Sequence, residues 1–405
     1  MSNIPKLRFP EFTDAWEKCK LGKIAIKVTE KNKDGIFQET LTNSAEFGVI
    51  SQRDFFDKDI SNPENLNGYY IVKPNDFVYN PRISNLAPVG PIKRNQLNRI
   101  GIMSPLYFIF RVSSNIDLDF LDAFFSTNLW HLFLKLNGDS GARADRIAIK
   151  DKIFMEMPIS IPTLPEQQKI GNLFKQLDWL ITLHKRKWDD VILLKKALLQ
   201  KMFPKNGSDF PALRFPEFTD AWEKCKLESL GKILTGNTPK TKEKENWTIE
   251  GEGYIWITPT DIDGLLTSKS ARSLTETGWK KSRQLPPNSV LITSIASIGK
   301  NTINTVPAAF NQQINAIIPE NNDAYFILSA MVNCEQDFAE LAGQTAVPII
   351  NKTTFSEFEI FTPTLPEQQK IGALFRRLDR LITLHKRQHE HYQLLKKALL
   401  QQMFV

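Results

Sequence analysis

The chain has 405 residues, of which 41% are hydrophobic, and a formal net charge of +7 at pH 7. This length predicts two or three domains, and the hydrophobic content is sufficient for packed cores. The moderate positive charge suits a polyanionic partner but does not establish one. The three cysteines form no Cys-x-x-Cys pair, and no apolar run reaches the length of a membrane span. We therefore expect a cytoplasmic protein with no membrane partner, no structural disulfide and no zinc site.

The chain begins with a segment that returns in its second half. Residues 5–21 read PKLRFPEFTDAWEKCKL and residues 211–227 read PALRFPEFTDAWEKCKL, so 16 of 17 positions are identical. We call each copy a lead segment. The repeat predicts two similar units, joined by a short Pro/Gly/Ser/Asn linker at 204–210.

Each lead segment is followed by a middle region of some 140 residues that reads as mixed α and β. In the first, FVYNPRI at 77–83 is typical of a strand, and a helical stretch follows at 118–136. In the second, YIWITPTDI at 254–262 is typical of a strand, and 325–341 is helical. The middles share only a faint register, which predicts one fold carrying two different surfaces. Tandem duplication with relaxed middles is the alternative.

Each unit is predicted to end in a long helix. Residues 162–203 and 363–404 are identical at 31 of 42 positions, and each copy opens with Thr-Leu-Pro-Glu. This opening is typical of a capping box with proline in the first turn, and it assigns Glu166 and Glu367 to their own helix starts. At ~1.5 Å per residue, each helix would be roughly 60 Å long.

An apolar stripe with steps of three and four residues runs along the first long helix. Its members are Ile170, Leu173, Phe174, Leu177, Leu180, Ile181, Val191, Leu194 and Leu198. A helix of this length cannot bury its stripe against a small domain, so we expect the two copies to pair as an intramolecular coiled coil. Two separate helices, each lying on its own domain, are the alternative. The equivalent residues His184 and His385 are expected to set the register rather than to bind a metal.

The outer faces of the helices are basic. The candidates for holding partner proteins are Lys169, Lys185, Arg186, Lys195 and Lys196, with their repeats in the second copy. A solvated coiled-coil exterior explains the same residues, so the pattern does not decide between the two.

The fold class is therefore α+β, with two mixed α/β domains separated by two long antiparallel helices in a pseudo-twofold internal repeat. The expected segments are a first domain at 1–161, a helix at 162–203, the linker at 204–210, a second domain at 211–362 and a helix at 363–405.

Catalytic motifs are missing from the sequence. It has no Gly-x-x-x-x-Gly-Lys-Ser/Thr loop, no glycine-rich dinucleotide fingerprint, no His-Glu-x-x-His and no Gly-x-Ser-x-Gly. We therefore expect a binding protein rather than an enzyme, with no cofactor held by this chain.

Polar and basic side chains gather in or beside predicted loops of both middles. Arg suits guanine edges, Asn and Gln suit adenine, and Lys, Ser and Thr suit phosphates. In the first middle the candidates are Ser51, Gln52, Arg53, Asn80, Arg82, Lys93, Arg94, Arg143 and Arg146. In the second middle they are Thr235, Asn237, Thr238, Lys240, Thr258, Lys280, Lys281, Arg283, Lys300, Asn311, Gln312 and Gln313. Any single cluster is more often a solvated loop, so the hypothesis rests on their joint presence in both middles.

The chain resembles, along its whole length, the DNA-specificity subunit of a type I restriction-modification system. The resemblance is carried by the two PTLPEQQKIG helix starts and by the LITLHKR and LLKKALLQ blocks. The Gly-Asn-Thr-Pro run at 236–239, the strand at 255–258 with Asp261, and Asn-Gln-Gln at 311–313 also fit. The first middle has a familiar Val-Ile-Ser-Gln-Arg run at 49–53 but lacks a clear Gly-x-Thr-Pro.

This resemblance implies a non-catalytic subunit in which each target-recognition domain reads one half of a bipartite, asymmetric site on double-stranded DNA. It implies that the helices set the spacer and dock two modification subunits, which bind S-adenosylmethionine and methylate adenine N6. Restriction subunits, as ATP-dependent translocases and nucleases, would join them, so S-adenosylmethionine, ATP and Mg belong to partners. The alternatives are a duplicated coiled-coil scaffold that binds only proteins, and a fused DNA methyltransferase.

Overall fold

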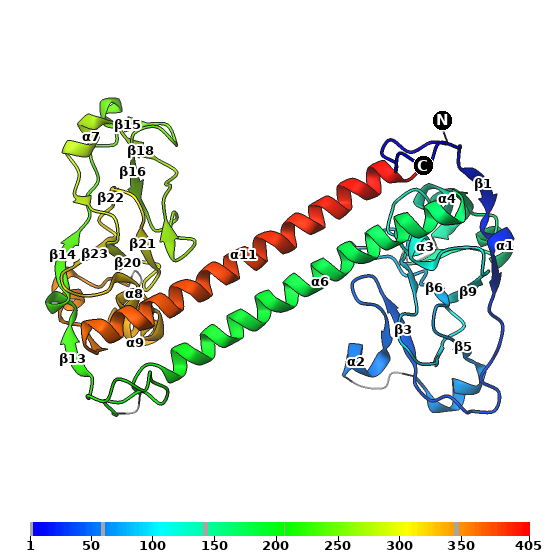
Figure 1. The fold of residues 1–405 in the computed structure, drawn as a ribbon, viewed down its shortest axis with the longest axis horizontal. Coiled ribbons are helices and arrows are strands. Elements are labelled where there is room, and N and C mark those ends of the chain that lie inside the picture. The colour runs from blue at the N-terminus through cyan, green and yellow to red at the C-terminus, as the bar shows by residue number, and fades with distance from the viewer. Residues whose placement is uncertain (1–2, 58–60, 141–144, 206, 344–347) are drawn as a thin grey trace. The chain divides into compact units, whose positions relative to one another are not determined.

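The computed structural model divides into two compact units. The structure describes residues 3–57, 61–140, 145–205, 207–343 and 348–405. Unit 1 consists of Met1–His184 with Arg387–Val405, and unit 2 of Lys185–Lys386. Each unit therefore combines one lead segment, one middle and a part of both long helices (Figure 1).

Unit 1 is built on a four-stranded sheet in the order β2-β9-β6-β7. The central strands are short apolar runs that are buried along β6, and turn residues bound them, as expected for core strands. The rings of Phe77 and Phe110 stack at 5.4 Å, and Phe125 of α3 contacts both, so α3 covers this sheet. The elements are β1 (Glu17–Lys20), α1 (Leu21–Ile24), β2 (Ala25–Lys27), β3 (Leu41–Ser44), β4 (Gly48–Ser51), α2 (Gln52–Phe56), η1 (Pro63–Gly68), β5 (Tyr70–Val72), β6 (Phe77–Tyr79), β7 (Ile92–Arg94), β8 (Gly101–Met103), β9 (Phe108–Val112), α3 (Leu118–Phe125), α4 (His131–Asn137), β10 (Asp139–Ser140), β11 (Ile147–Ala148), α5 (Asp151–Phe154) and β12 (Pro158–Ile161).

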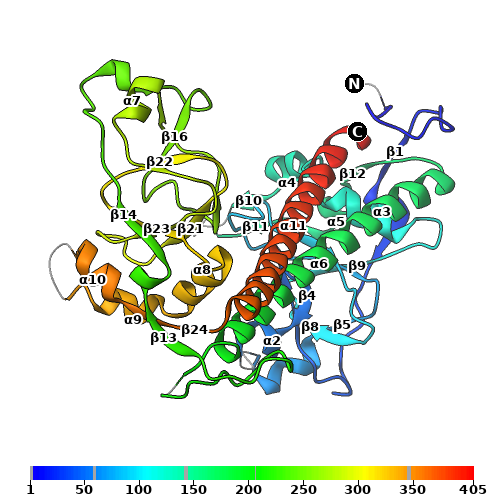
Figure 2. The ribbon, with the colours of Figure 1, turned by 60° about the vertical axis from the view of Figure 1, so that its left-hand side comes forward.

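Unit 2 contains two five-stranded sheets, in the orders β14-β23-β20-β21-β17 and β15-β18-β16-β22-β19. Figure 2 shows β16 and β22 of the second sheet above β14, β23 and β21 of the first. The elements are β13 (Glu223–Lys226), η2 (Leu227–Ser229), β14 (Gly231–Thr235), η3 (Lys244–Asn246), β15 (Trp247–Thr248), β16 (Tyr254–Ile257), β17 (Leu266–Thr267), β18 (Ser273–Leu274), α7 (Glu276–Lys280), β19 (Gln284–Leu285), β20 (Val290–Thr293), β21 (Asn301–Asn304), β22 (Ala308–Phe310), β23 (Ile314–Pro319), α8 (Ala324–Asn333), α9 (Glu335–Glu340), α10 (Lys352–Glu357) and β24 (Glu359–Thr362).

The long helices are α6 (Leu164–Lys201) and α11 (Leu365–Met403), and their antiparallel pairing is confirmed within each unit. In unit 1, Phe174 contacts Phe404, Asp178 pairs with Lys396 and His184 stacks on Tyr392, so numbers rise on one helix as they fall on the other. In unit 2, Phe203 contacts Phe375 and Lys195 pairs with Asp379 in the same sense. The buried His184 fits the expected polar position in the seam.

The expected stripe is wrong at Leu194. That side chain is 50% exposed, whereas the side chain of Lys195 is only 15% exposed and pairs with Asp379 at 2.6 Å. An α-helix has 3.6 residues per turn, so a stripe with mixed steps of three and four can continue through either Leu194 or Lys195. The carboxylate of Asp379 selects the lysine, and Lys195 is therefore not on the outer face.

The assignment of Glu166 and Glu367 to capping boxes is also incomplete. Glu166 is fully buried, and its two oxygens accept hydrogen bonds from Arg8 at 2.7 and 2.8 Å. Arg214 holds Glu367 in the same bidentate way at 2.8 Å. A buried carboxylate requires an opposite charge, and the lead segment supplies it in both units.

Each lead segment also holds the end of the other long helix. Leu7 N–H donates to the carbonyl of Gln402, and Leu213 N–H donates to that of Lys201. Trp16 packs edge-to-face on Phe404 in the same way that Trp222 packs on Phe203. The lead segment thus joins the start of one long helix to the end of the other, and this junction is built twice.

The Pro-Glu-Gln-Gln-Lys-Ile-Gly motif seats the middle on its helix. Gln167 accepts a hydrogen bond from Asp117 N–H at the start of α3 and donates to the carbonyl of Pro162. A Cβ at Gly171 would lie 2.3 Å from Asp117 Oδ1, so the close approach of α3 requires glycine. Gln368 and Gly372 make the same contacts with Asp323, which fixes α8 on α11.

Candidate nucleic-acid interface

The loops of unit 2 converge on the turn Asn311–Gln313, which connects β22 of one sheet to β23 of the other. The backbone N–H of Asn311 donates to Ile257 O at the end of β16, and Asn237 N–H donates to Phe310 O. Ser294 N–H donates to Gln313 O from the loop after β20. Strand ends from both sheets therefore meet at one place, which we call the unit 2 edge.

The Gly-Asn-Thr-Pro motif places its residues against this turn. A Cβ at Gly236 would lie 2.1 Å from the backbone oxygen of Asn311 and 2.4 Å from that of Phe310, so only glycine fits. Thr238 donates from its hydroxyl to the side chain of Gln312. The motif and the turn are 74 residues apart in sequence, and the structure brings the two predicted clusters together.

Asn237 holds a further predicted cluster in place. Its side-chain amide donates to Lys281 O at 2.9 Å, and its oxygen accepts from Arg283 N–H at 2.7 Å. The exposed Arg283 side chain in turn donates to Thr235 O. A guanidinium and the exposed amide of Gln312 thus lie at the same edge, the side-chain types that address guanine and adenine.

A buried residue positions Thr235. The Thr235 hydroxyl donates to Oδ1 of the buried Asn315 at 2.6 Å, and the Asn315 amide donates to Ser294 Oγ at 2.9 Å. Sequence reasoning did not single out Asn315, because nothing in an apolar strand such as NAIIP indicates that its first residue points toward a loop cluster.

Lys240 and Lys281 do not present free charges. Lys281 pairs with Glu243 and Glu245, and Lys240 pairs with Glu243 at 3.1 Å. The hydrogen bonds from Lys281 and Lys240 lower the pKa of Glu243 to about 2, so this carboxylate is charged at any pH near neutrality. In this arrangement a DNA phosphate would compete with Glu243 for both lysines.

The remaining predicted residues of unit 2 lie around the same edge. Thr258 directly follows β16, and its hydroxyl donates to Asp261 Oδ2 at 2.6 Å. Lys300 is exposed, and its backbone N–H donates to Thr293 Oγ1 at the end of β20. Lys280 is the last residue of α7, and its Nζ lies 3.6 Å from Glu276 Oε1. Arg272, which was not among the predicted residues, is exposed, and its Cζ lies 5.6 Å from the centre of the Trp247 ring.

Unit 1 has a comparable convergence, which we call the unit 1 edge. Asn80 donates from its amide to Asn43 O at 2.9 Å and accepts from Arg82 N–H at 3.0 Å. Arg82 and Arg146 face each other in an antiparallel β-bridge, and both are exposed. Gly90 closes the loop with φ of +81°, where a Cβ would lie 2.0 Å from Asn80 O. Arg143 lies outside the described residues.

The buried Asn43 holds the backbone of the unit 1 edge in place through hydrogen bonds. It is 1% exposed and donates to Val78 O at 2.7 Å and Pro91 O at 3.2 Å. No local pattern in the sequence distinguishes Asn43, because its partners lie 35 and 48 residues away.

Five predicted residues of unit 1 lie elsewhere. Ser51 and Gln52 are buried at the far end of the β3–β4 hairpin, where the Gln52 oxygen accepts from Ser61 at 2.6 Å, so the fold itself uses them; only Arg53 is exposed. Arg94 contacts Asp119 and Asp122 of α3. Lys93 lines a hollow on the side of α11.

Neither a metal centre nor a membrane segment is found in the part of the chain that the structure describes. No three His, Cys, Asp or Glu side chains there are grouped as metal ligands. No helix among those residues is both long enough and apolar enough to cross a bilayer. That this chain itself holds no cofactor stays a prediction.

The comparisons with known proteins point to one class. A family model for the type I restriction modification DNA specificity domain matches residues 219–391. The specificity subunit MjaIX of Methanocaldococcus jannaschii is 30% identical over 192 residues, covering 45% of this chain and 44% of that protein. The specificity subunit MjaVIII of the same organism is 25% identical over 419 residues, covering 97% of this chain and 92% of that protein. The chain thus spans about half or less of the length of the first curated relatives.

The architecture agrees with that class. The S subunit of a type I restriction-modification system from M. genitalium has a TM-score of 0.63 to this chain, with 13% identity and 99% coverage of both chains, which shows the shared fold. The fold, with two mixed α/β units and two long helices, is that of a DNA-specificity subunit. Its sequence is similar to specificity subunits of type I restriction-modification systems, and the type I specificity domain itself is matched over residues 219–391. Proteins of this family are generally non-catalytic.

Proposed function

We propose that the chain reads a bipartite, asymmetric site on double-stranded DNA, with the unit 1 edge on one half and the unit 2 edge on the other. The observation that carries this proposal is the contrast within one chain. The two junctions are built from nearly identical residues, whereas the two edges present different side chains. Arg82 and Arg146 dominate one edge, and Arg283 and Gln312 the other. Two readers of different chemistry select two different half-sites.

In this proposal the two long helices set the length of the unread spacer between the half-sites. Two modification subunits dock on the repeated surfaces and supply S-adenosylmethionine and adenine N6 methylation. Restriction subunits supply ATP- and Mg-dependent translocation and cleavage. The repetition of the junction supports two equivalent docking places, because each junction offers the same side chains to a partner.

The test is genome-wide methylation sequencing of cells that carry this chain with its modification subunit, as wild type, Arg82→Ala or Arg283→Ala. Each variant should relax one base position in one half-site only, and the two variants should affect opposite halves. A lost bidentate contact costs about 1–3 kcal/mol of discrimination. Lys187→Gln is the matched control, since the equivalent residue of α11 is Gln388. Relaxation of the same half by both variants would refute the assignment, and a wild-type chain that binds no duplex DNA would favour a protein-only scaffold.

A further inference from the structure

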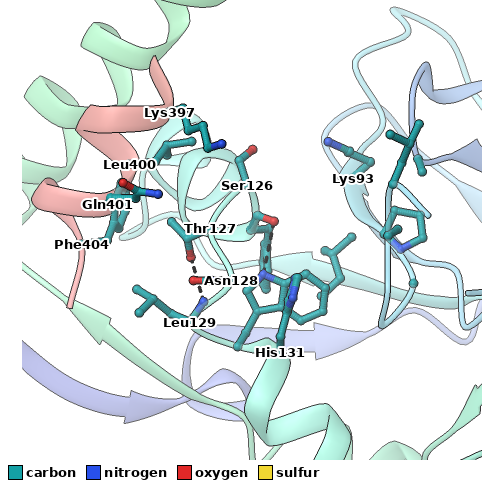
Figure 3. Close-up of a pocket in the computed structure, with 18 of the residues that line it drawn as sticks. Lys93, Ser126, Thr127, Asn128, Leu129, His131, Lys397, Leu400, Gln401 and Phe404 are labelled. Atoms are coloured by element: carbon teal, nitrogen blue, oxygen red, sulfur yellow. Dashed lines mark hydrogen bonds between the residues drawn. The ribbon is translucent and has the colours of Figure 1, made fainter. Parts of the chain in front are cut away.

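A hollow of about 560 Å³ lies in unit 1 between the middle and the last turns of α11. Its walls come from the loop after Arg82, from the turn between α3 and α4, and from the LLKKALLQ block. Figure 3 shows Lys93 and Lys397 pointing toward each other across it, with Ser126, Leu400 and Gln401 nearby. The hollow shares Gly90 and Pro91 with the loop of the unit 1 edge, but Asn80, Arg82 and Arg146 are not among its lining residues.

The charge of this hollow is one-sided. Lys93, Lys396 and Lys397 line it, and the described residues of its lining include no Asp or Glu. Burial and the charge of Lys396 lower the pKa of Lys93, although Asp122 and Asp178 act in the opposite direction. Lys396 pairs with Asp178 at 2.5 Å, but Lys397 is exposed. The hollow therefore favours a negatively charged occupant.

Exposed leucines adjoin the hollow. Leu86 and Leu129 line it and are 72% and 43% exposed. From there α4 begins, and Leu132 and Leu136 are 63% and 74% exposed. These two leucines are four residues apart, so they share one face of the helix. We call Leu129, Leu132 and Leu136 the leucine stripe.

The corresponding helix of unit 2 has no such stripe. Leu134 of α4 and Phe338 of α9 are the fully buried residues of the two helices. Two positions before and after Phe338 lie Gln336 and Glu340, which hydrogen-bond to each other at 3.3 Å. The leucine stripe of α4 thus has no counterpart among the α9 residues Glu335–Glu340, whereas the junction is built in both units.

We propose that the leucine stripe and the lysine-lined hollow form a docking surface for one acidic amphipathic helix of a partner protein, bound once per chain. Apolar side chains of that helix cover the leucines, and its carboxylates meet Lys93 and Lys397. A second copy of this chain would bring a second set of lysines to the same place, which like-charge repulsion opposes. DNA phosphates would account for the lysines but leave the four exposed leucines uncovered. The proposal stands independently of the proposed reading of DNA.

The test uses the full-length chain and a fluorescein-labelled 20-residue helical peptide with leucines on one face and glutamates elsewhere. Two control peptides replace either the glutamates by lysine or the leucines by serine. By fluorescence anisotropy, the acidic amphipathic peptide should bind about tenfold or more tightly than either control. Equal binding of the lysine peptide, or no binding of the acidic peptide, would overturn the proposal.

Variants locate the binding. Leu132→Gln with Leu136→Glu introduces the polar character of α9 and should weaken peptide binding about tenfold or more. Lys397→Gln should weaken it about threefold at low salt and less at high salt. Ile249→Gln, which changes a 69% exposed apolar side chain of unit 2, and Lys187→Gln are the controls. An unchanged dissociation constant for Leu132→Gln with Leu136→Glu would contradict the proposal.

Two further measurements separate the other occupants. If random duplex DNA displaces the peptide and Lys397→Gln weakens DNA binding, the surface is a phosphate site and the proposal is wrong. If sedimentation shows a wild-type dimer that Leu132→Gln with Leu136→Glu dissolves, the occupant is a second copy. Unchanged DNA binding and a monomeric wild type, together with the peptide results above, support the proposal. Thermal unfolding of every variant checks that the exposed changes leave the fold intact.

Discussion

At the residue scale, the unit 2 edge depends on contacts that leave no room for a side chain. Gly236 passes so close to the turn Asn311–Gln313 that the motif and the turn behave as one surface. Gly264 lies in a loop of the same unit, with no atom within 4 Å of the position of its Cβ. Position 236 therefore requires glycine for steric reasons, whereas position 264 has room for a side chain, although both lie in loops.

We expect Gly236→Ala to disturb the unit 2 edge, because backbone oxygens at 2.1 and 2.4 Å would have to move. Overpacking of this kind costs about 1–3 kcal/mol. Urea unfolding should show this loss, and DNA binding through the unit 2 half-site should weaken while the unit 1 half is still read. Gly264→Ala is the matched control and should change neither. Wild-type stability and binding in Gly236→Ala would show that the turn can shift without consequence.

Glu243 provides a second prediction at this scale. It pairs with Lys240 and Lys281, and with a pKa of about 2 it remains charged well below pH 5. Removing its charge in Glu243→Gln should free Lys240 for phosphates and leave Lys281 paired with Glu245 alone. DNA affinity at low salt should then rise several-fold, and the salt dependence of log K should steepen by about one to two phosphate contacts.

The control for this experiment is Glu250→Gln, which removes an exposed carboxylate of the same region. Mild acidification to pH 5 should not mimic Glu243→Gln. The sign follows from the depressed pKa, because protonation of Glu243 begins only as the pH falls toward about 2. Equal salt slopes in wild type and Glu243→Gln would mean that this corner of unit 2 does not meet DNA.

At the element scale, the sequence predicts best what repeats along one element. The period of the apolar stripe and the uninterrupted stretch from Leu164 to Lys201 predict α6 and its pairing with α11. The sequence could not predict which of Leu194 and Lys195 faces the seam, because the choice depends on Asp379, 184 residues away. In the same way, the local sequence places Glu166 in a capping box, but its carboxylate binds Arg8, which is 158 residues away in the sequence.

The candidate site shows the same limit. Asn80 with Arg82, and the Gly-Asn-Thr-Pro and Asn-Gln-Gln clusters, were predicted as loops and lie at the two edges. Ser51 and Gln52 have the same polar chemistry but are buried, because Ser51 ends β4 and Gln52 begins α2, away from the edge. Residue type alone does not distinguish a polar side chain that satisfies the interior from one that faces a ligand.

The two seam ion pairs allow a matched prediction, since Lys195–Asp379 and Lys396–Asp178 occupy equivalent positions. Asp379 is 17% exposed and also accepts from Tyr325 at 2.8 Å, whereas Asp178 is 55% exposed. Asp379→Asn should therefore destabilise the chain by about 2–4 kcal/mol, because the Lys195 side chain, which is only 15% exposed, loses its counter-charge. Asp178→Asn should cost less than about 1 kcal/mol. Urea unfolding measures both, and equal costs would mean that burial does not distinguish the pairs.

At the scale of the whole molecule, the chain is organised by two junctions rather than by two consecutive domains. Each junction needs a lead segment, the start of one long helix and the end of the other, so each compact unit contains residues from both halves of the sequence. The middles are attached to this frame through the same contacts, Gln167 with Gly171 in one unit and Gln368 with Gly372 in the other. A middle should therefore be replaceable by the other one without loss of the frame.

The decisive replacement puts the first middle into both units. Residues 228–358 are exchanged for a second copy of residues 22–157, which keeps the lead segments, the strands β13 and β24 and both helices. Arg376→Lys accompanies the exchange, because Lys175 at the equivalent position pairs with Asp119 of the first middle. If antiparallel helices relate the two units by a half rotation, two identical readers meet opposite strands of DNA. Methylation sequencing of cells with this chain and its modification subunit should then yield a palindromic interrupted motif, composed of the unit 1 half-site and its inverted copy. An asymmetric motif, or a direct repeat of one half-site, would contradict the twofold arrangement, and the wild-type chain in the same cells provides the asymmetric reference.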